Sequence, residues 1–195
     1  MSRKRKASYH HGHLRAALLE AAVDLIGARG LHGLSLRECA RRAGVSHAAP
    51  YRHFADRDAL LHAIAEQGFA WLTEAGRKAM EGIDAPRERL DRYGAAYVRF
   101  AYEHPVHHRV MFASELPDKD DATDSGAFDL LLEAAAGLRG PGEDPTLTAL
   151  ASWSLVHGLA MLILDRRIPA GKVETAEDVE ALAYELFRQW RGPLA

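Results

Sequence analysis

The side chains best suited to chemistry lie close together between Ser46 and Phe54. This segment, Ser46-His47-Ala48-Ala49-Pro50-Tyr51-Arg52-His53-Phe54, combines imidazole, phenol and guanidinium groups. Such groups form hydrogen bonds with base edges and with phosphate oxygens. A helix, a turn that contains glycine (here Gly44) and a second short helix form the arrangement that sets one helix into the DNA major groove. The segment therefore predicts contact with DNA.

The charge distribution favours a polyanionic partner for the first third of the chain. The net charge is only −2, but residues 1–57 hold 11 Lys and Arg against 4 Asp and Glu, which leaves 14 and 23 beyond residue 57. The two parts therefore carry +7 and −9. A basic segment of helical composition most simply faces phosphates, and a solvated basic face is the alternative. Arg3 to Lys6 form a basic arm that either follows phosphate or the minor groove or is a solvated tail.

Short helices are predicted to position the chemically active segment. Apolar residues recur at steps of four, three and four from Leu14 to Leu25, which predicts an amphipathic helix from about Gly12 to Ala28. A second helix opens at Ser35, because Ser35 and Glu38 have the spacing at which each side chain caps the other residue's amide.

The third helix carries the reading segment and is expected to be short. The second helix ends at Gly44, and Ser46 caps the third, which has about two turns before Asp56 opens a fourth. Pro50 falls about four residues past the Ser46 cap, where its missing amide predicts a local irregularity.

Composition predicts an all-α fold. Ala and Leu number 60, whereas Val, Ile and Thr together number 18, so strong helix formers dominate. The single cysteine, Cys39, cannot form an internal disulfide, and we expect it to face the core. The first residues lack the apolar run of an export signal, so we expect a cytoplasmic protein.

Six further helical segments follow, in a domain expected to span residues 58–195 after a DNA-binding domain at 1–57. A polar segment from Glu115 to Gly126 is expected to form a loop or a partly disordered connector. The expected helices run from Asp56 to Met80, from Asp84 to Glu103, from Pro105 onward, from Phe128 to Leu138, from Asp144 to Arg166, and from Thr175 to about residue 191.

The sequence resembles the TetR family of transcriptional regulators from about Tyr9 to Glu66. The resemblance rests on Tyr9-His10-His11-Gly12-His13-Leu14-Arg15, on the run from Ser35 to Ser46 and on Tyr51-Arg52-His53-Phe54. It implies an all-helical homodimer whose first three helices bind a palindromic operator, while a variable helical domain binds a small effector. Trp153-Ser154-Leu155-Val156-His157-Gly158 resembles the Trp-His-Gly signature of one subgroup's carboxy-terminal domain.

The resemblance also indicates which side chains contact DNA. The exposed positions of the third helix align with the family's reading positions, and Arg37 and Arg57 sit where the family contacts base or phosphate. The predicted DNA-binding residues are Ser35, Arg37, Ser46, His47, Ala48, Tyr51, Arg52, His53 and Arg57.

Aromatic and sulfur-containing side chains of the larger domain suggest an effector pocket. Each alone is better explained by core packing, but together with the resemblance they predict an apolar site in which Tyr93, Tyr97 and His157 supply the polar anchors. The predicted pocket residues are Trp71, Tyr93, Tyr97, Phe100, Met111, Phe112, Trp153, His157 and Met161.

Residues Pro145 to Leu164 carry no formal charge and are long enough to cross a membrane. Thr, Ser, His and Gly residues interrupt the run, so we interpret it instead as a helix buried on nearly all sides. A helix with two apolar faces needs its own core and a second subunit as partners. We therefore expect a homodimer formed through helices near 145–166 and 175–191.

Metal binding and catalysis find little support. The chain has 11 histidines, but Pro105 lies between His104 and His108, and no cysteine or HxxxH partner completes a zinc site. No nucleophile elbow or phosphate loop is present in the sequence. We therefore expect no metal, no cofactor and no enzymatic activity.

The prediction is a homodimeric DNA-binding regulator, most simply a repressor that a small-molecule effector releases from a palindromic operator. The alternatives are an architectural DNA-binding protein without an effector and a cytoplasmic helical enzyme.

Overall fold

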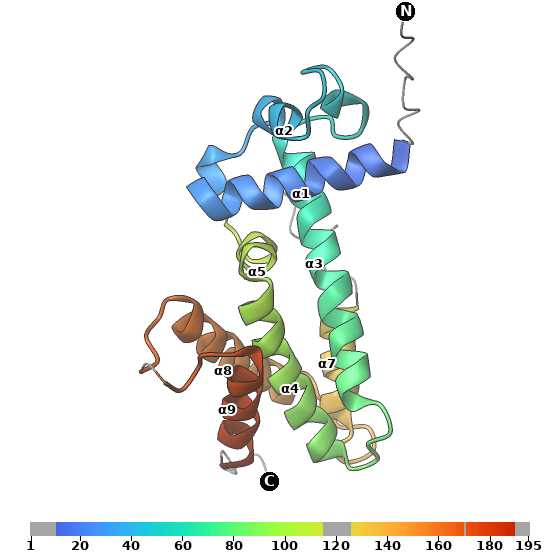
Figure 1. Ribbon diagram of the computed structural model, residues 1–195. Helices are drawn as coiled ribbons and strands as arrows, with labels where there is room; N and C mark the ends of the chain where they lie inside the picture. The colour runs from blue at the N-terminus through green and yellow to red at the C-terminus, as the bar shows by residue number, and fades with distance from the viewer. Residues whose placement is uncertain (1–10, 115–125, 170, 190–195) are drawn as a thin grey trace, which may run out of the picture. The chain divides into compact units, whose positions relative to one another are not determined.

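The structure is a computed structural model that describes residues 11–114, 126–169 and 171–189. Within these ranges every regular element is a helix, which confirms the predicted all-α class (Figure 1). The chain divides into two compact units, one within residues 1–64 and 114–117 and the other within 65–113 and 118–195. The basic arm, Trp190 and the predicted connector up to residue 125 lie outside the described residues.

In the first unit η1 and α2 pack on the long helix α1, η2 packs on α2, and the beginning of α3 completes the unit. Its core holds fully buried Leu18, Leu25 and Leu60, and the Cys39 side chain is buried as predicted. The elements are α1 (His11–Arg29), the 3₁₀ helix η1 (Leu31–Gly33), α2 (Leu36–Arg42), the 3₁₀ helix η2 (Pro50–Arg52) and α3 (Arg57–Met80).

The start of α2 confirms one half of the predicted capping box and corrects the other. Ser35 Oγ accepts a hydrogen bond from the Glu38 amide at 3.2 Å. The Glu38 carboxylate instead accepts two bonds from the Arg41 guanidinium, at 2.6 and 2.9 Å. An arginine one turn further along offers a charge-assisted pair, which is stronger than a bond to a neutral amide. Gly44 ends the helix with φ +68°, the left-handed conformation expected of it.

The predicted two-turn third helix is wrong in type and length. The chain forms a turn after Ser46 and then the single 3₁₀ turn η2. The Ala49 amide bonds to the Ser46 carbonyl, and the His53 amide bonds to the Pro50 carbonyl at 2.8 Å, both with the three-residue spacing of 3₁₀ structure. Pro50 has no amide to donate, which is the physical reason for the irregularity that the sequence predicts here.

Helix α4 is the centre of the second unit. It packs against α5, α7, α8 and α9, and Figure 1 shows α8 and α9 on one side of it. Most of its circumference is buried, and its charged residues other than the buried Asp91 lie on the partly or fully exposed rim. The helices that follow α3 are α4 (Pro86–Glu103), α5 (Pro105–Met111), α7 (Ala127–Ala136), α8 (Thr146–Leu164) and α9 (Ala176–Gln189).

Side-chain hydrogen bonds explain where α8 and α9 begin. Asp144 Oδ1 accepts from the Thr146 amide at 2.9 Å, and Thr175 and Asp178 cap each other's amides at 3.0 and 3.1 Å. At the start of α4 the N-cap residue is Ala85 and not the expected Asp84, because Pro86 already occupies the first helical position, where no amide is needed.

Within one chain, helix α8 is buried on one face only, and the predicted burial of its other face by a second subunit stays a prediction. Leu147, Leu150, Met161 and Leu162 are exposed, Leu147 to 77%. By length and composition alone this helix would suffice to cross a membrane. Its other face packs on α4 and α7 through buried residues such as Val156 and Ile163. One apolar face therefore faces the core, and none of the described residues covers the opposite apolar face.

We predict that Leu60→Ala lowers the free energy of unfolding by about 2–5 kcal/mol, because it removes a fully buried side chain from the close-packed first unit. Chemical denaturation followed by circular dichroism measures the loss. The exposed Lys78→Ala substitution is the control and should change stability by less than about 0.5 kcal/mol. Equal losses for the two variants would contradict the assignment of Leu60 to the core.

Candidate DNA-binding surface and ligand cavity

Most of the predicted DNA-binding side chains lie on the surface of the first unit. Tyr51 stands out, since 53% of this large aromatic residue is exposed. A tyrosine on the surface of a short turn supplies a hydroxyl donor and a flat ring with little conformational freedom to lose. The exposed members of the predicted set are Ser35, Arg37, Ser46, His47, Ala48, Tyr51 and Arg52.

Two arginines of this set are free to bind an anion. Within the described part of the chain, Arg37 and Arg52 form no ion pair or hydrogen bond through their guanidinium groups. Neighbouring arginines are engaged, because Arg41 pairs with Glu38 and Arg42 lies 3.6 Å from Asp24. A guanidinium without an internal partner offers its full charge to phosphate or to a guanine edge.

The structure places His53 and Arg57 differently from the other seven residues. Both are half-buried, and the Nε2 atom of His53 is buried. Arg57 Nη2 donates to the Leu31 carbonyl oxygen at 3.1 Å, and its Nη1 lies 3.2 Å from Asp58 Oδ1. Arg57 thus ties the start of α3 to the η1 turn, a structural task that the sequence did not suggest.

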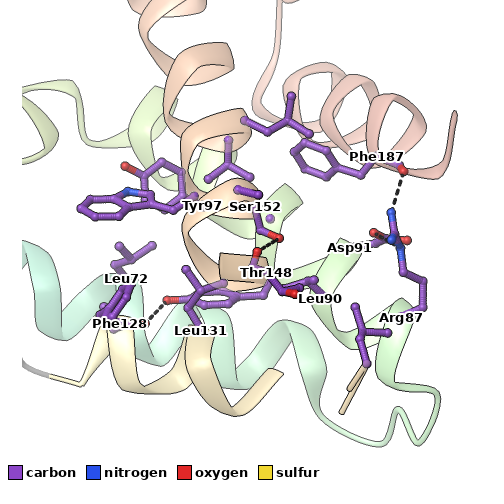
Figure 2. A pocket seen from close by; sticks show the side chains of 18 of the residues that line it. Leu72, Arg87, Leu90, Asp91, Tyr97, Phe128, Leu131, Thr148, Ser152 and Phe187 are labelled. Atoms are coloured by element: carbon purple, nitrogen blue, oxygen red, sulfur yellow. Dashed lines mark hydrogen bonds and ion pairs between the residues drawn. The ribbon is translucent and has the colours of Figure 1, made fainter. Parts of the chain in front are cut away.

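The second unit contains a cavity of about 640 Å³. Its wall is mainly apolar, and its volume falls in the range of about 300–1,000 Å³ that is typical of small-molecule sites. Figure 2 shows Leu72 and Phe128 toward one end, Thr148 and Ser152 in the middle, and Arg87, Asp91 and Phe187 at the other end. The aromatic lining residues are Phe69, Tyr93, Tyr97, Phe112, Phe128, Trp153 and Phe187.

Glycines allow the helices to close around this cavity. A Cβ atom on Gly94 of α4 would lie 2.8 Å from the Phe187 ring of α9, and one on Gly76 of α3 would collide with the Tyr93 ring. Both aromatic rings line the cavity. The absence of a side chain at these two positions therefore sets the position of two walls.

A buried polar cluster lies behind one wall. The Tyr97 hydroxyl is 3.1 Å from His108 Nε2 and 2.8 Å from His157 Nδ1, so it joins α4 to α5 and α8. The two imidazoles stack with centroids 5.2 Å apart, and Phe112 lies against both. A phenol holds one proton, so it donates to one imidazole and accepts an N–H from the other.

Burial keeps this cluster neutral. Removal from water lowers the pKa of His108 to about 4, with a smaller contribution from the nearby His157, whose own pKa burial also lowers. Burial raises the pKa of Tyr97 above its ordinary value. On α5, burial and the neighbouring His104 lower the pKa of His107 to about 4. These groups therefore present hydrogen bonds and no charge at neutral pH.

The structure brings five of the nine predicted pocket residues to the cavity wall and places the other four elsewhere. His157 stands behind Tyr97, and Phe100 is buried against the His104 ring. Trp71 is 40% exposed and packs on the rings of His104 and His107. Met161 is also 40% exposed, on the outer face of α8. The residues that line the cavity are Tyr93, Tyr97, Met111, Phe112 and Trp153.

Sequence reasoning missed the charged end of the cavity. Arg87 Nε lies 3.1 Å from Asp91 Oδ1, one helical turn apart, and Arg87 Nη2 donates to the Phe187 carbonyl oxygen at 3.3 Å. The signal was available, because Asp91, Gly94 and Tyr97 follow each other at helical spacing on the face that carries the tyrosines. A carboxylate within an apolar helical stripe is the pattern that identifies such a group.

The histidine clusters do not assemble into a metal site among the residues that the structure describes, where no group of three or more His, Cys, Asp or Glu side chains converges. His107 Nε2 instead lies 3.1 Å from Gln67 Oε1, and His108 bonds to Tyr97.

Comparisons with known proteins agree with this architecture. Residues 18–64 match the family model for bacterial regulatory proteins of the tetR family, and residues 90–188 match the model for the tetracyclin repressor-like C-terminal domain. The two matches fall on the unit with the exposed arginines and on the unit with the cavity. Since the second model alone covers about half of the chain, the protein belongs to the TetR family.

Individual relatives fit this assignment. A solved protein of unknown function from Rhodococcus sp. RHA1 is 36% identical, with a TM-score of 0.73, over 94% of this chain and 98% of its own. AibR, solved with isovaleryl coenzyme A and operator DNA, is 25% identical, with a TM-score of 0.66, over 89% of this chain and 97% of its own. An HTH-type transcriptional repressor of Mycobacterium tuberculosis is 32% identical over 49% of this chain, and the match spans half of that relative's length.

We predict that stability falls as the pH drops from about 6.5 toward 4. In the folded protein the pKa of His108 is about 4, whereas the unfolded chain takes up the proton near 6.5, so acid favours unfolding in this window. The maximal contribution is about 1.4 kcal/mol per pH unit for one such histidine. Urea denaturation between pH 7 and pH 4.5 should show a shallower pH dependence for His108→Gln, and an unchanged slope for the exposed control His32→Gln. Identical slopes in all three proteins would refute this account.

Proposed function

We propose that the protein is a one-component transcriptional regulator, most simply a repressor, that binds a palindromic operator and releases it when a small molecule fills the cavity. The proposal rests on the observation that the two units offer two different kinds of binding site. One presents a surface with two free arginines and exposed Tyr51, and the other holds a mainly apolar cavity of about 640 Å³. AibR, with operator DNA and a small ligand in one complex, supports this combination.

The proposed dimer uses the uncovered face of α8, together with α9. Positions 147, 151, 154, 158, 161 and 165 follow each other at steps of four and three and are all exposed. Gly158 lies on this face, and a Cβ added to it would meet nothing within 4 Å in the protomer. A glycine inside a helix costs about 1 kcal/mol relative to alanine, so close approach of a second α8 gives it a reason that the protomer lacks. A contact between two α8 helices would also cover the exposed apolar residues of this helix, so that no membrane is needed to account for them.

Three finer points belong to the same proposal. The Trp-His-Gly subgroup is supported because Trp153 lines the cavity and His157 fixes Tyr97, so the signature residues of α8 serve the ligand site. A cytoplasmic location follows from the need to meet chromosomal DNA. Catalysis is not proposed, because the tyrosine hydroxyls and the Arg87–Asp91 pair at the cavity are engaged with each other or with the backbone.

Selection of bound sequences from random duplex DNA tests the regulator function directly. We expect an inverted repeat whose half-sites lie about 34–36 Å apart or a multiple of that distance, since each short reading segment covers few base pairs and a dimer presents two. Random or asymmetric selected sites would instead favour an architectural DNA-binding protein.

The two kinds of DNA contact should respond differently to substitution. Arg52→Ala should weaken binding to specific and non-specific duplexes alike and reduce the salt slope by about one, because a phosphate contact releases one counterion. His47→Ala should relax the preference at particular operator positions. Electrophoretic mobility shifts at several salt concentrations separate the two effects. Arg57→Ala is the matched comparison, and its loss should appear mainly in thermal stability, through the bond to the Leu31 carbonyl. A salt slope that changes only in Arg57→Ala would reverse these assignments.

Dimerisation should depend on the outer face of α8. Leu150→Glu and Gly158→Arg place charges on this face, and we expect each to yield monomers in sedimentation velocity and to lose at least about ten-fold in affinity for the palindrome. Helix content should stay unchanged, because neither position is buried in the protomer. Lys78→Glu, on α3, is the charge-changing control. Fully dimeric Gly158→Arg protein would exclude this interface.

A further inference from the structure

Aromatic rings from four separate segments meet along one part of the cavity wall. Phe69, Phe112, Trp153 and Phe128 follow each other in contact, with successive ring centroids 5.8, 6.0 and 5.9 Å apart. Phe69 belongs to α3, Phe128 to α7 and Trp153 to α8, and Phe112 directly follows α5. All four residues line the cavity, and we call this part of the wall the aromatic end.

The rings of the aromatic end are tilted against one another. The planes of Phe69 and Phe112 make an angle of 77°, and Trp153 meets Phe112 at 48° and Phe128 at 56°. Trp153 also meets the ring of His157, at 72°. Among the described residues no ring therefore lies parallel to the Trp153 indole, although Trp153 lines the cavity. Offset stacking, a preferred geometry of aromatic pairs, is left to a ligand.

Polar groups next to the aromatic end are already bonded. The Tyr97 hydroxyl lies 3.1 Å from His108 Nε2 and 2.8 Å from His157 Nδ1, and Phe112 packs against both imidazoles. Burial lowers the pKa of both histidines, so neither carries a charge at neutral pH. A ligand group that lies at this end therefore gains mainly from apolar and ring contacts.

The wall has a different character toward the start of α4. Leu138 lines the cavity there, and a Cβ added to the neighbouring Gly137 would lie 2.8 Å from the Pro86 side chain. Figure 2 shows Phe128 toward one end of the cavity and Arg87, the residue after Pro86, at the other. Leu138 therefore supplies aliphatic surface away from the aromatic end.

We infer that the ligand contains a planar aromatic ring that stacks on Trp153 in the aromatic end. The inference rests on the proposed function and names the class of molecule that the same cavity selects. Apolar burial alone would favour a saturated ring, because cyclohexane exposes at least as much apolar surface as benzene. Ring stacking reverses this order, since an aromatic pair gains about two- to ten-fold in affinity beyond the burial of its surface. Ring recognition and ordinary core packing therefore predict opposite preferences.

Two matched probes test the inference: 6-phenylhexan-1-ol and 6-cyclohexylhexan-1-ol, which differ only in the saturation of the ring. Both are uncharged and carry the same chain and hydroxyl group. Isothermal titration of the full chain measures their affinities. We expect the phenyl probe to bind about three- to ten-fold tighter than the cyclohexyl probe. Equal affinities, or tighter binding of the cyclohexyl probe, would overturn the inference.

Trp153→Leu should abolish the preference for the phenyl probe, because leucine fills space but has no π surface. The ratio of the two affinities is the decisive quantity, since a general loss of packing weakens both probes alike. Leu138→Ala, at the other end of the cavity, is the matched control, and it should weaken both probes and leave their ratio unchanged. An unchanged ratio in Trp153→Leu would show that the indole does not select the ligand, and would also overturn the inference.

Nuclear magnetic resonance of the indole N–H tests the same contact without removing Trp153, should Trp153→Leu fail to fold. The chain has three tryptophans, so the variant W71F/W190F leaves Trp153 as the single indole. The ring current of a stacked phenyl group should shift this resonance further at saturation than the cyclohexyl probe does. Equal shifts with the two probes would contradict stacking on Trp153 and overturn the inference.

Operator release separates this inference from the function on which it rests. Mobility shifts with the selected palindrome are repeated in the presence of each probe. Release that needs less of the cyclohexyl probe than of the phenyl probe would leave the regulator function standing and overturn the aromatic-ligand inference. If neither probe binds a chain that still selects a palindrome, both the ligand-released function and the inference fail. Release at a lower concentration of the phenyl probe, with the preference lost in Trp153→Leu, supports both.

Discussion

The hydroxyl of Tyr97 imposes the constraint on which the second unit is built. It lies in the interior, where an unsatisfied hydroxyl costs about 1–3 kcal/mol, so its two imidazole partners must stay within reach. His108 comes from α5 and His157 from α8, and one phenol on α4 thus fixes the relative positions of three helices. Because Phe112 and Trp153 pack around these rings, the polar cluster also sets the shape of the aromatic wall. Polar bonds as well as apolar packing therefore determine how closely α4, α5 and α8 approach one another beside the cavity.

A second set of interactions holds α9 against α4. Val179, Ala183 and Phe187 are buried at this contact, and they supply most of its stabilisation. Arg99 adds ion pairs with Glu177 and Glu180 of α9, but such exposed pairs contribute little individually. These ion pairs instead help to fix the alignment of α9 on α4, because Arg99 contacts two carboxylates that lie one turn apart on α9. That alignment delivers the Phe187 ring and carbonyl to the charged end of the cavity.

The sequence predicted the helical architecture well, because caps and apolar periodicity act over a few residues. Thr175 with Asp178, Asp144 and Gly44 behave as their local chemistry requires. Pro50 also acted locally, but propensity could not reveal that the chain would keep only one 3₁₀ turn there. Partners that arise from tertiary packing were the main omissions. Arg57 donates to the Leu31 carbonyl oxygen, 26 residues away in sequence. Met161 lies on the outer face of α8, because the other face packs against α4 and α7.

Helix α3 gives the proposed switch a physical route that is independent of the ligand's identity. Phe69 and Leu72 of this helix line the cavity, and the same continuous helix begins at Arg57, which is bonded to the η1 turn of the first unit. A ligand that prefers one position of Phe69 and Leu72 must displace a stiff helix as a whole, since its backbone hydrogen bonds resist local bending. A differential affinity of about 1–3 kcal/mol between two positions of α3 is enough to change operator affinity by roughly 5- to 150-fold. By linkage, operator DNA must weaken ligand binding by the same factor, so the cavity needs only modest selectivity between two states to control the DNA-binding surface.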